Sequence, residues 1–317
     1  MTKIFRIGAM AVLAVALLSG CRAVSDSLVD SGRVMLRGLS GVEVAVFESQ
    51  GATISYLERD AAGPTIVLLH GFASEKDSWL RFLRKIPKNY RIIALDLPGH
   101  GGSSRDPQRS YTVESMVSLV EAAILALADQ PVHMVGTSLG GMIATLYTAR
   151  NIKRVHTLTL FAPAGVYPPN PSEFQAMLDR GENPLIAASR DDFDRLMDLV
   201  FFDPPPLMWP VGPSIRRYAL SRAPFHQKIW NDLWPGHPTV DEHLPNIKIP
   251  VLLVWGTNDR ILDVSSVEVF ENLLPDVETV LVERLGHATV NERPADMARL
   301  QRDFLARHTG QVAAGSR

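Results

Sequence analysis

The chain has 317 residues, of which 46% are hydrophobic and 21% are charged, a composition typical of a folded protein with a sizeable apolar core. Its formal net charge is -2, and its lysines and arginines are scattered rather than gathered in blocks. Because this balance offers no cationic surface for phosphate groups, we expect no nucleic-acid partner.

The first twenty residues have the features of an export signal. MTKIFR carries positive charges, and the apolar run after it is too short to span a bilayer comfortably. Cys21, the only cysteine, directly follows Leu18-Ser19-Gly20 and resembles the lipobox cysteine of bacterial lipoproteins. The resemblance implies acylation of Cys21 as a membrane anchor, which needs more than one acyl chain. Arg22 is not the aspartate associated with inner-membrane retention, which favours the outer membrane. An ordinary signal peptide with a chance cysteine is the alternative.

Beyond residue 41 the chain alternates between short apolar runs and segments with helical spacing. The runs expected as strands are 42–49, 52–58, 65–71, 90–101, 131–136, 155–163, 250–256 and 277–283. The segments expected as helices are 78–86, 113–128, 139–150, 267–274 and 294–307. Strands separated by helices form βαβ units. The pattern therefore predicts an α/β fold with a mostly parallel sheet that helices cover on both faces.

The alternation stops between Val166 and Pro245. This segment is dense in proline and holds three of the five tryptophans of the chain. It is too long for an ordinary loop, so we expect an inserted helical cap over the sheet. The predicted organisation is a signal peptide over 1–20, a tether over 21–40, an α/β core over 41–165 and 246–310, a cap over 166–245, and a tail over 311–317.

One serine stands between glycines at the end of a predicted strand. VHMVGTSLGGMIA, Val132 to Ala144, contains Gly-x-Ser-x-Gly between a strand and a helix, the arrangement of a nucleophile elbow. Bulk at Gly136 or Gly140 would collide with the neighbouring strand or helix, and the serine backbone would be strained. The motif predicts that Ser138 is a nucleophile exposed at the end of the sheet, above a helix N-terminus.

A serine nucleophile needs a base, and the base needs an orienting carboxylate. In this type of fold the chain order is serine, then an acid, then histidine. Asp259 follows the predicted strand at 250–256, and His287 follows the one at 277–283. Asp263 is the rival carboxylate, but Asp259 lies nearer the strand end. We therefore predict the triad Ser138, Asp259 and His287.

Two backbone N–H groups are expected to form an oxyanion hole. One belongs to Leu139, directly after the nucleophile, and the other to Phe72 in the loop after LLHG. His70 is expected to brace that loop by hydrogen bonding rather than to act in catalysis. Asp96 and His100 of DLPGHG are interpreted as turn-bracing residues in the same way.

Several motifs, in order, resemble those of one enzyme family. HGFASEKDSWLRF, DLPGHGGS, VGTSLGGMIA, FAPAG, WGTNDRILDVSS and GHATVNERP look like the capped α/β-hydrolases of the bacterial lipase and monoacylglycerol lipase group. The resemblance implies the same triad and oxyanion hole, and carboxylic esters as substrates, with monoacylglycerols and short or medium acyl esters favoured. Leu139 stands where several relatives carry methionine, a departure that changes little.

Two other functions remain open from the sequence. A carbon–carbon bond hydrolase of the same fold keeps the serine, and its carboxylate-bearing substrate would need an arginine such as Arg216, Arg217 or Arg222. A lipoprotein that binds lipid without turnover is the second alternative, against which the complete triad argues. No grouping of His, Cys and Asp suggests a metal, and the chemistry requires no cofactor. The sequence leaves the oligomeric state open.

Overall fold

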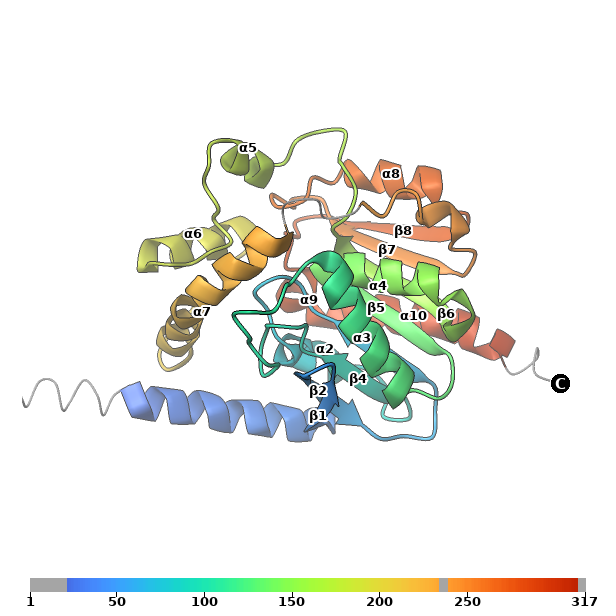
Figure 1. The fold of residues 1–317 in the computed structure, drawn as a ribbon, viewed down its shortest axis with the longest axis horizontal. Helices are drawn as coiled ribbons and strands as arrows, with labels where there is room; N and C mark the ends of the chain where they lie inside the picture. Colours follow the sequence, from blue (N-terminus) through green and yellow to red (C-terminus); the bar gives the residue numbers. More distant parts are fainter. Residues whose placement is uncertain (1–21, 234–238, 313–317) are drawn as a thin grey trace, which may run out of the picture.

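A computed structural model describes residues 22–233 and 239–312 of the chain (Figure 1). The predicted signal peptide and Cys21 lie outside the described residues. In the described part, no helix combines the length and the apolar character needed to cross a membrane.

Eight strands form one sheet in the order β1-β2-β4-β3-β5-β6-β7-β8. Strand β2 pairs antiparallel with both β1 and β4, and all other pairings in the sheet are parallel. The predicted α/β fold is therefore confirmed. The bounds are β1 Glu43–Ser49, β2 Ala52–Arg59, β3 Thr65–Leu69, β4 Arg91–Leu95, β5 Val132–Ser138, β6 Val155–Pro163, β7 Val251–Gly256 and β8 Val277–Val282. Strands β3 to β8 therefore bring their carboxyl ends to one edge of the sheet.

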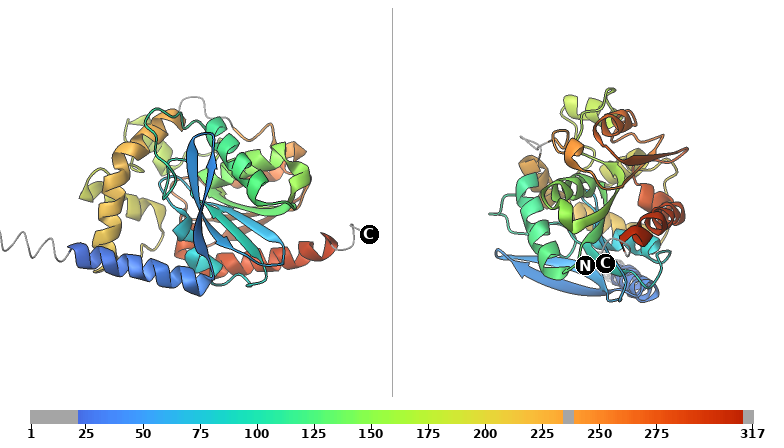
Figure 2. Two further views of the ribbon diagram at one scale, coloured as in Figure 1. Left: turned by 60° about the horizontal axis from the view of Figure 1, so that its bottom comes forward. Right: turned by 90° about the vertical axis from the view of Figure 1, so that its right-hand side faces the viewer.

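Helices cover both faces of this sheet (Figure 2). One face carries α3 Val113–Leu127, α4 Leu139–Arg150 and α8 Ser266–Leu273. The opposite face carries η1 Lys76–Trp79, α2 Leu80–Leu83, α9 Thr289–Glu292 and α10 Pro294–Val312. Two short 3-10 helices, η2 Ile152–Arg154 and η3 Leu244–Asn246, complete the core elements.

The alternation of side chains along each strand divides the apolar core in two. On β3, Val67 and Leu69 pack toward α3 and α4, whereas Ile66 and Leu68 pack toward α2 and α10. All of these side chains are fully buried. Both faces of the parallel strands are thus buried. This explains why their sequences are continuous apolar runs rather than alternating apolar and polar residues.

Three helices lie between β6 and β7, within the segment that we name the cap, residues 166–245. They are α5 Glu173–Asp179, α6 Arg190–Val200 and α7 Val211–Leu233. Helix α6 begins at a capping box in which the side chains and backbones of Ser189 and Asp192 bond reciprocally. In Figure 1 these helices stand to one side of the sheet, beyond the end of β5.

The segment expected as a tether is helical over residues 22–40. This N-terminal helix runs along the outside of the molecule, from the cap to the core (Figure 2). At the cap end, Ser25 donates to the carbonyl of Pro210 at 2.8 Å and Asp26 accepts from Ser214 at 2.7 Å. At the core end, Arg37 forms two bonds to Asp77. The helix is therefore bonded to both parts of the fold.

Candidate active site

Ser138 occupies a sharp turn between β5 and α4. Its backbone has φ 52° and ψ -123°, a conformation that costs a residue with a side chain about 1–3 kcal/mol. A Cβ at Gly136 would lie 2.4 Å from the carbonyl oxygen of Gly140, and a Cβ at Gly140 would lie 2.3 Å from that of Leu69. The predicted exclusion of bulk at both glycines is confirmed. The turn presents Ser138 at the carboxyl edge of the sheet.

Asp259 and His287 meet at the ends of β7 and β8. Nδ1 of His287 lies 2.7 Å from Oδ2 of Asp259, whose side chain is fully buried. The other carboxylate oxygen accepts from the backbone N–H groups of Ile261 and Leu262, each at 2.9 Å. These bonds hold the carboxylate in one orientation. Because Nδ1 donates to Asp259, Nε2 of the imidazole is left as a proton acceptor.

The rival carboxylate serves a different purpose. Asp263 accepts from the backbone N–H of Ser265 at 2.9 Å and so closes the turn before α8. Of the two candidates, the structure brings Asp259 into contact with His287. The carboxylate nearer the strand end is thus the one beside the imidazole.

The loop after β3, which carries Phe72, is braced from beneath. Nε2 of His70 accepts from the backbone N–H of Leu97 at 3.0 Å, and Nδ1 lies 2.7 Å from the carbonyl of Gly71. The ring therefore joins the Phe72 loop to the turn after β4, and its predicted bracing role is confirmed. His70 is wholly buried, and burial lowers its pKa to about 4.

Sequence reasoning missed a buried ion pair under the same loop. Nζ of Lys76 lies 2.6 Å from one carboxylate oxygen of Asp96, and the backbone N–H of Lys76 donates to the other at 2.6 Å. Gly102 also donates to this carboxylate, at 2.7 Å. Asp96 was expected to brace its own turn, which it does. Its pairing with Lys76 depends on tertiary packing that no local pattern reports.

Ser138 and His287 both line a cavity of about 520 Å³ between the core and the cap. This volume falls within the range of small-molecule sites, about 300–1,000 Å³. Gly71 and Phe72 also line this cavity. The cap contributes a mostly apolar surface made of Leu185, Phe193, Leu196, Met197, Val200, Phe201, Leu207, Ile215 and Ala219.

The N-terminal helix also reaches this cavity, which was not expected from the sequence. Arg33 and Leu36 are among the lining residues. Arg33 forms an ion pair with Glu75 at 2.9 Å, and the hydroxyl of Tyr218 donates to the same carboxylate at 3.1 Å. Burial raises the pKa of Glu75, an effect that Arg33 opposes. This cluster gives the apolar cavity a polar wall.

Aromatic rings join the cap to the predicted oxyanion loop. The centre of the Phe72 ring lies 5.8 Å from the ring centre of His100, 5.8 Å from that of His226 and 5.7 Å from that of Trp230. His100 and His226 are stacked at 5.7 Å. Burial lowers the pKa of both histidines to about 3. The contact between cap helix α7 and the Phe72 loop is thus made by uncharged rings.

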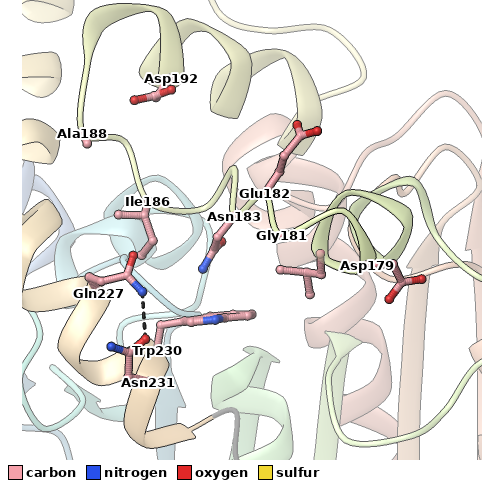
Figure 3. Close-up of a pocket in the computed structure, with 11 residues that line it drawn as sticks. Asp179, Gly181, Glu182, Asn183, Ile186, Ala188, Asp192, Gln227, Trp230 and Asn231 are labelled. Carbon is pink, nitrogen blue, oxygen red and sulfur yellow. Dashed lines mark hydrogen bonds between the residues drawn. The ribbon is translucent and has the colours of Figure 1, made fainter.

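A second hollow of about 580 Å³ lies within the cap (Figure 3). Acidic and amide side chains surround it, and Gln227 donates to Asn231 at 2.8 Å on one wall. Neither Ser138 nor His287 is among its lining residues. The reactive groups therefore belong to the first cavity.

The arginines considered for a carbon–carbon bond hydrolase are engaged elsewhere. Arg216 pairs with Asp194, Arg217 pairs with Asp26, and the guanidinium of Arg222 lies 4.9 Å from the centre of the Tyr218 ring. None of these three arginines lines the cavity that holds Ser138. In the described part of the chain, no group of three or more His, Cys, Asp or Glu side chains is arranged to hold a metal ion.

Comparison with known proteins gives consistent matches. Residues 66–300 match the model of the Alpha/beta hydrolase family. A monoacylglycerol lipase of Xenopus laevis, abhd6-B, is 30% identical over 279 residues, which cover 84% of this chain and 83% of the relative. Lipase 1 of Psychrobacter immobilis is 28% identical over 250 residues, covering 77% and 78%.

A solved structure extends the likeness through nearly the whole chain. A membrane phospholipase A, described as a bacterial virulence factor, superimposes with a TM-score of 0.88 at 39% sequence identity. The match covers 96% of this chain and 98% of that one. The N-terminal helix, the core and the cap thus recur together in a related bacterial protein.

Proposed function

Because the chain belongs to the alpha/beta hydrolase family, and is a lipase- or esterase-like serine hydrolase within it, we propose that Ser138, Asp259 and His287 hydrolyse carboxylic esters through an acyl-serine intermediate. The observation that carries the proposal is the pairing of His287 with Asp259 at 2.7 Å on the cavity that Ser138 also lines. Together the three residues supply the nucleophile, the base and the orienting carboxylate that acyl transfer requires.

The proposed reaction has two halves. Nε2 of His287 takes the hydroxyl proton of Ser138 as Oγ bonds to the ester carbonyl carbon. The imidazolium then gives that proton to the alkoxide oxygen as the ester C–O bond breaks, so the alcohol departs and the acyl group stays on Ser138. Water then attacks the carbonyl carbon of the acyl-serine as His287 takes its proton. The imidazolium returns that proton to Oγ of Ser138 as the acyl C–O bond breaks, which releases the carboxylic acid and restores the free serine. Asp259 keeps the proton of the neutral ring on Nδ1 throughout.

The oxyanion of each tetrahedral intermediate is assigned to the backbone N–H groups of Phe72 and Leu139. Leu139 is the first residue of α4, so its N–H has no partner within the helix and the helix dipole favours negative charge there. Phe72 lines the same cavity as Ser138, and its neighbour Gly71 lies against the serine, since a Cβ at Gly71 would be 3.1 Å from Cβ of Ser138. Loss of one such donor in other enzymes costs about 3–4 kcal/mol of activation free energy.

The cavity favours an ester with an uncharged acyl chain. Its cap wall is apolar, and each buried methylene of a substrate gains about 0.8 kcal/mol there. The polar wall of Arg33, Glu75 and Tyr218 suits the hydroxyl groups of a glycerol head. We therefore favour a monoacylglycerol as substrate, in keeping with the described activity of the Xenopus relative.

The membrane location is proposed from the sequence and one relative. Cys21 directly precedes the N-terminal helix that lines the cavity, so acylation there would hold the cavity near the bilayer. The related solved structure is of a membrane phospholipase A. We propose a lipoprotein that is exported and anchored through Cys21, with the outer membrane as the favoured site.

The experiment that tests this function is a panel of esters offered to the wild type and to Ser138→Ala. A p-nitrophenyl series from acetate to long chains, beside a monoacylglycerol and a phospholipid, measures both the activity and the preference. We expect the wild type to cleave p-nitrophenyl butyrate and the monoacylglycerol, and Ser138→Ala to cleave neither while it keeps the wild-type circular dichroism spectrum. Equal turnover by the two proteins would refute the proposal.

A further inference from the structure

The loop that carries His287 is bonded to the cap through one carboxylate, that of Glu292. Oε2 of Glu292 accepts from the backbone N–H of Gly286 at 3.2 Å and from that of Phe202 at 3.1 Å. Oε1 accepts from the backbone N–H of Asp203 at 3.2 Å. Gly286 directly precedes His287, whereas Phe202 and Asp203 come soon after cap helix α6. A single side chain therefore joins the two segments.

Backbone packing brings the same segments together on both sides of His287. The N–H of Ala288 donates to the carbonyl of Val200 at 2.9 Å. A Cβ at Gly286 would lie 2.6 Å from the backbone nitrogen of Phe202, so the two chains pass in direct contact. Arg284 adds a cation–π contact, with its guanidinium 5.3 Å from the centre of the Phe202 ring.

The cap segment held in this way also forms part of the cavity wall. Val200 and Phe201 line the cavity together with His287 and Ala288. Asp259 fixes the Nδ1 side of the imidazole, but the position of the ring also depends on the backbone that carries it. That backbone rests against the cap segment, and the contact is secured by Glu292.

We propose that Glu292 is a positioning residue that keeps His287 aligned by clamping its loop to the cap segment 200–203. The inference rests on the proposed function, in which His287 is the base. A carboxylate suits this position because it can accept several N–H bonds at once, and ionised acceptors form the stronger bonds. An amide cannot replace it fully, since its NH₂ group would face a backbone N–H donor.

The test compares Glu292→Gln with Glu283→Gln. Glu283 is an exposed residue on the same connection between β8 and His287, so its variant removes an equal charge without touching the clamp. With p-nitrophenyl butyrate, we expect Glu292→Gln to lower kcat by about tenfold, or about 1.4 kcal/mol of activation free energy, while KM changes less than about threefold. Glu283→Gln is expected to match the wild type in both constants.

Hydrogen exchange supplies a readout that is independent of catalysis. The amides of Phe202, Asp203 and Gly286 are expected to exchange faster in Glu292→Gln, whereas amides of strand β5 keep their wild-type protection. A milder variant, Glu292→Asp, keeps the charge with a shorter reach and should give intermediate values. It replaces Glu292→Gln in the test if that variant folds poorly. Wild-type kcat in a Glu292→Gln variant that folds would overturn the positioning role, and unchanged exchange at the three amides would overturn the clamp itself.

The two proposals fail in different ways. A wild type that cleaves no ester refutes the proposed function, and exchange at the three amides still decides whether Glu292 holds the loop. A wild type that is active, beside an equally active Glu292→Gln, leaves the triad in place and removes the positioning role.

Discussion

We predict that buried neutral histidines make the stability of this protein sensitive to mild acid. His70, His100 and His226 lie where cap helix α7 meets the core. Burial lowers their pKa values to about 4, 3 and 3. In the unfolded chain a histidine titrates near 6.5. Above a pH of about 6.5 these histidines are neutral in both states and cost no stability. Below that pH the unfolded chain binds protons that the fold excludes, so the free energy of unfolding decreases as the pH falls toward 4.

The expected magnitude follows from the size of the pKa shifts. At pH 5 the solution is about 1.5 pH units below the pKa of an unfolded histidine. At about 1.4 kcal/mol per unit, protonation of each histidine therefore stabilises the unfolded state by about 2 kcal/mol. The three rings together amount to about 6 kcal/mol, which is comparable with the whole stability of a typical domain, about 5–15 kcal/mol. Acid should therefore weaken the contact between the cap and the core.

Urea unfolding at pH 7 and pH 5 measures this loss. The free energy of unfolding of the wild type should fall by several kcal/mol between the two pH values. In His226→Phe, which keeps an aromatic ring against Phe72, the difference should shrink by about 2 kcal/mol. His243→Gln is the matched control, since His243 is a partly exposed histidine of the cap and its replacement should leave the difference unchanged.

Two results would refute this reasoning. One is equal stability of the wild type at pH 7 and pH 5. The other is an undiminished pH difference in His226→Phe, which would mean that this ring is not held neutral by its burial between Phe72 and His100.

Three further outcomes follow from the structure. Lys76→Met leaves the buried carboxylate of Asp96 without its cation and should cost about 3–5 kcal/mol in urea unfolding at neutral pH; an unchanged midpoint would contradict the buried pair. Gly136→Ala places a Cβ 2.4 Å from the Gly140 carbonyl and should abolish esterase activity or folding, whereas Gly38→Ala, with no atom within 4 Å, should preserve both; an active Gly136→Ala would argue against the tight turn. Cys21→Ser should move the enzyme from the membrane to the soluble fraction with esterase activity intact; retention in the membrane would argue against acylation at this residue.

The strands could be predicted because each reports its burial in its own residues. TIVLL, Thr65–Leu69, and VLLVWG, Val251–Gly256, are buried along their whole length and read as short apolar runs that end near glycine. The N-terminal helix could not be read in this way. Its sequence contains Gly32 and Gly38 and carries exposed apolar residues, and contacts with distant residues such as Pro210 and Asp77 hold it in place.

The candidate site was predictable where chemistry requires a residue type in a fixed local setting. Ser138 stands in a turn that only small neighbours permit, and Asp259 and His287 each follow a strand. Glu292 was missed because its role depends on Phe202, ninety residues away along the chain. The motif GHATVNERP contains this glutamate, but no spacing rule connects it to a cap segment whose path is set by packing.

The measurement that tests the central claim most directly is the mapping of a fluorophosphonate adduct on the folded enzyme by mass spectrometry of its peptides. The account predicts one adduct, on Ser138, which forms rapidly in the wild type and is strongly slowed in His287→Ala and in Asp259→Asn. Ester hydrolysis by a wild type that carries no adduct on Ser138, or labelling of Ser138 at the same rate in His287→Ala, would contradict it.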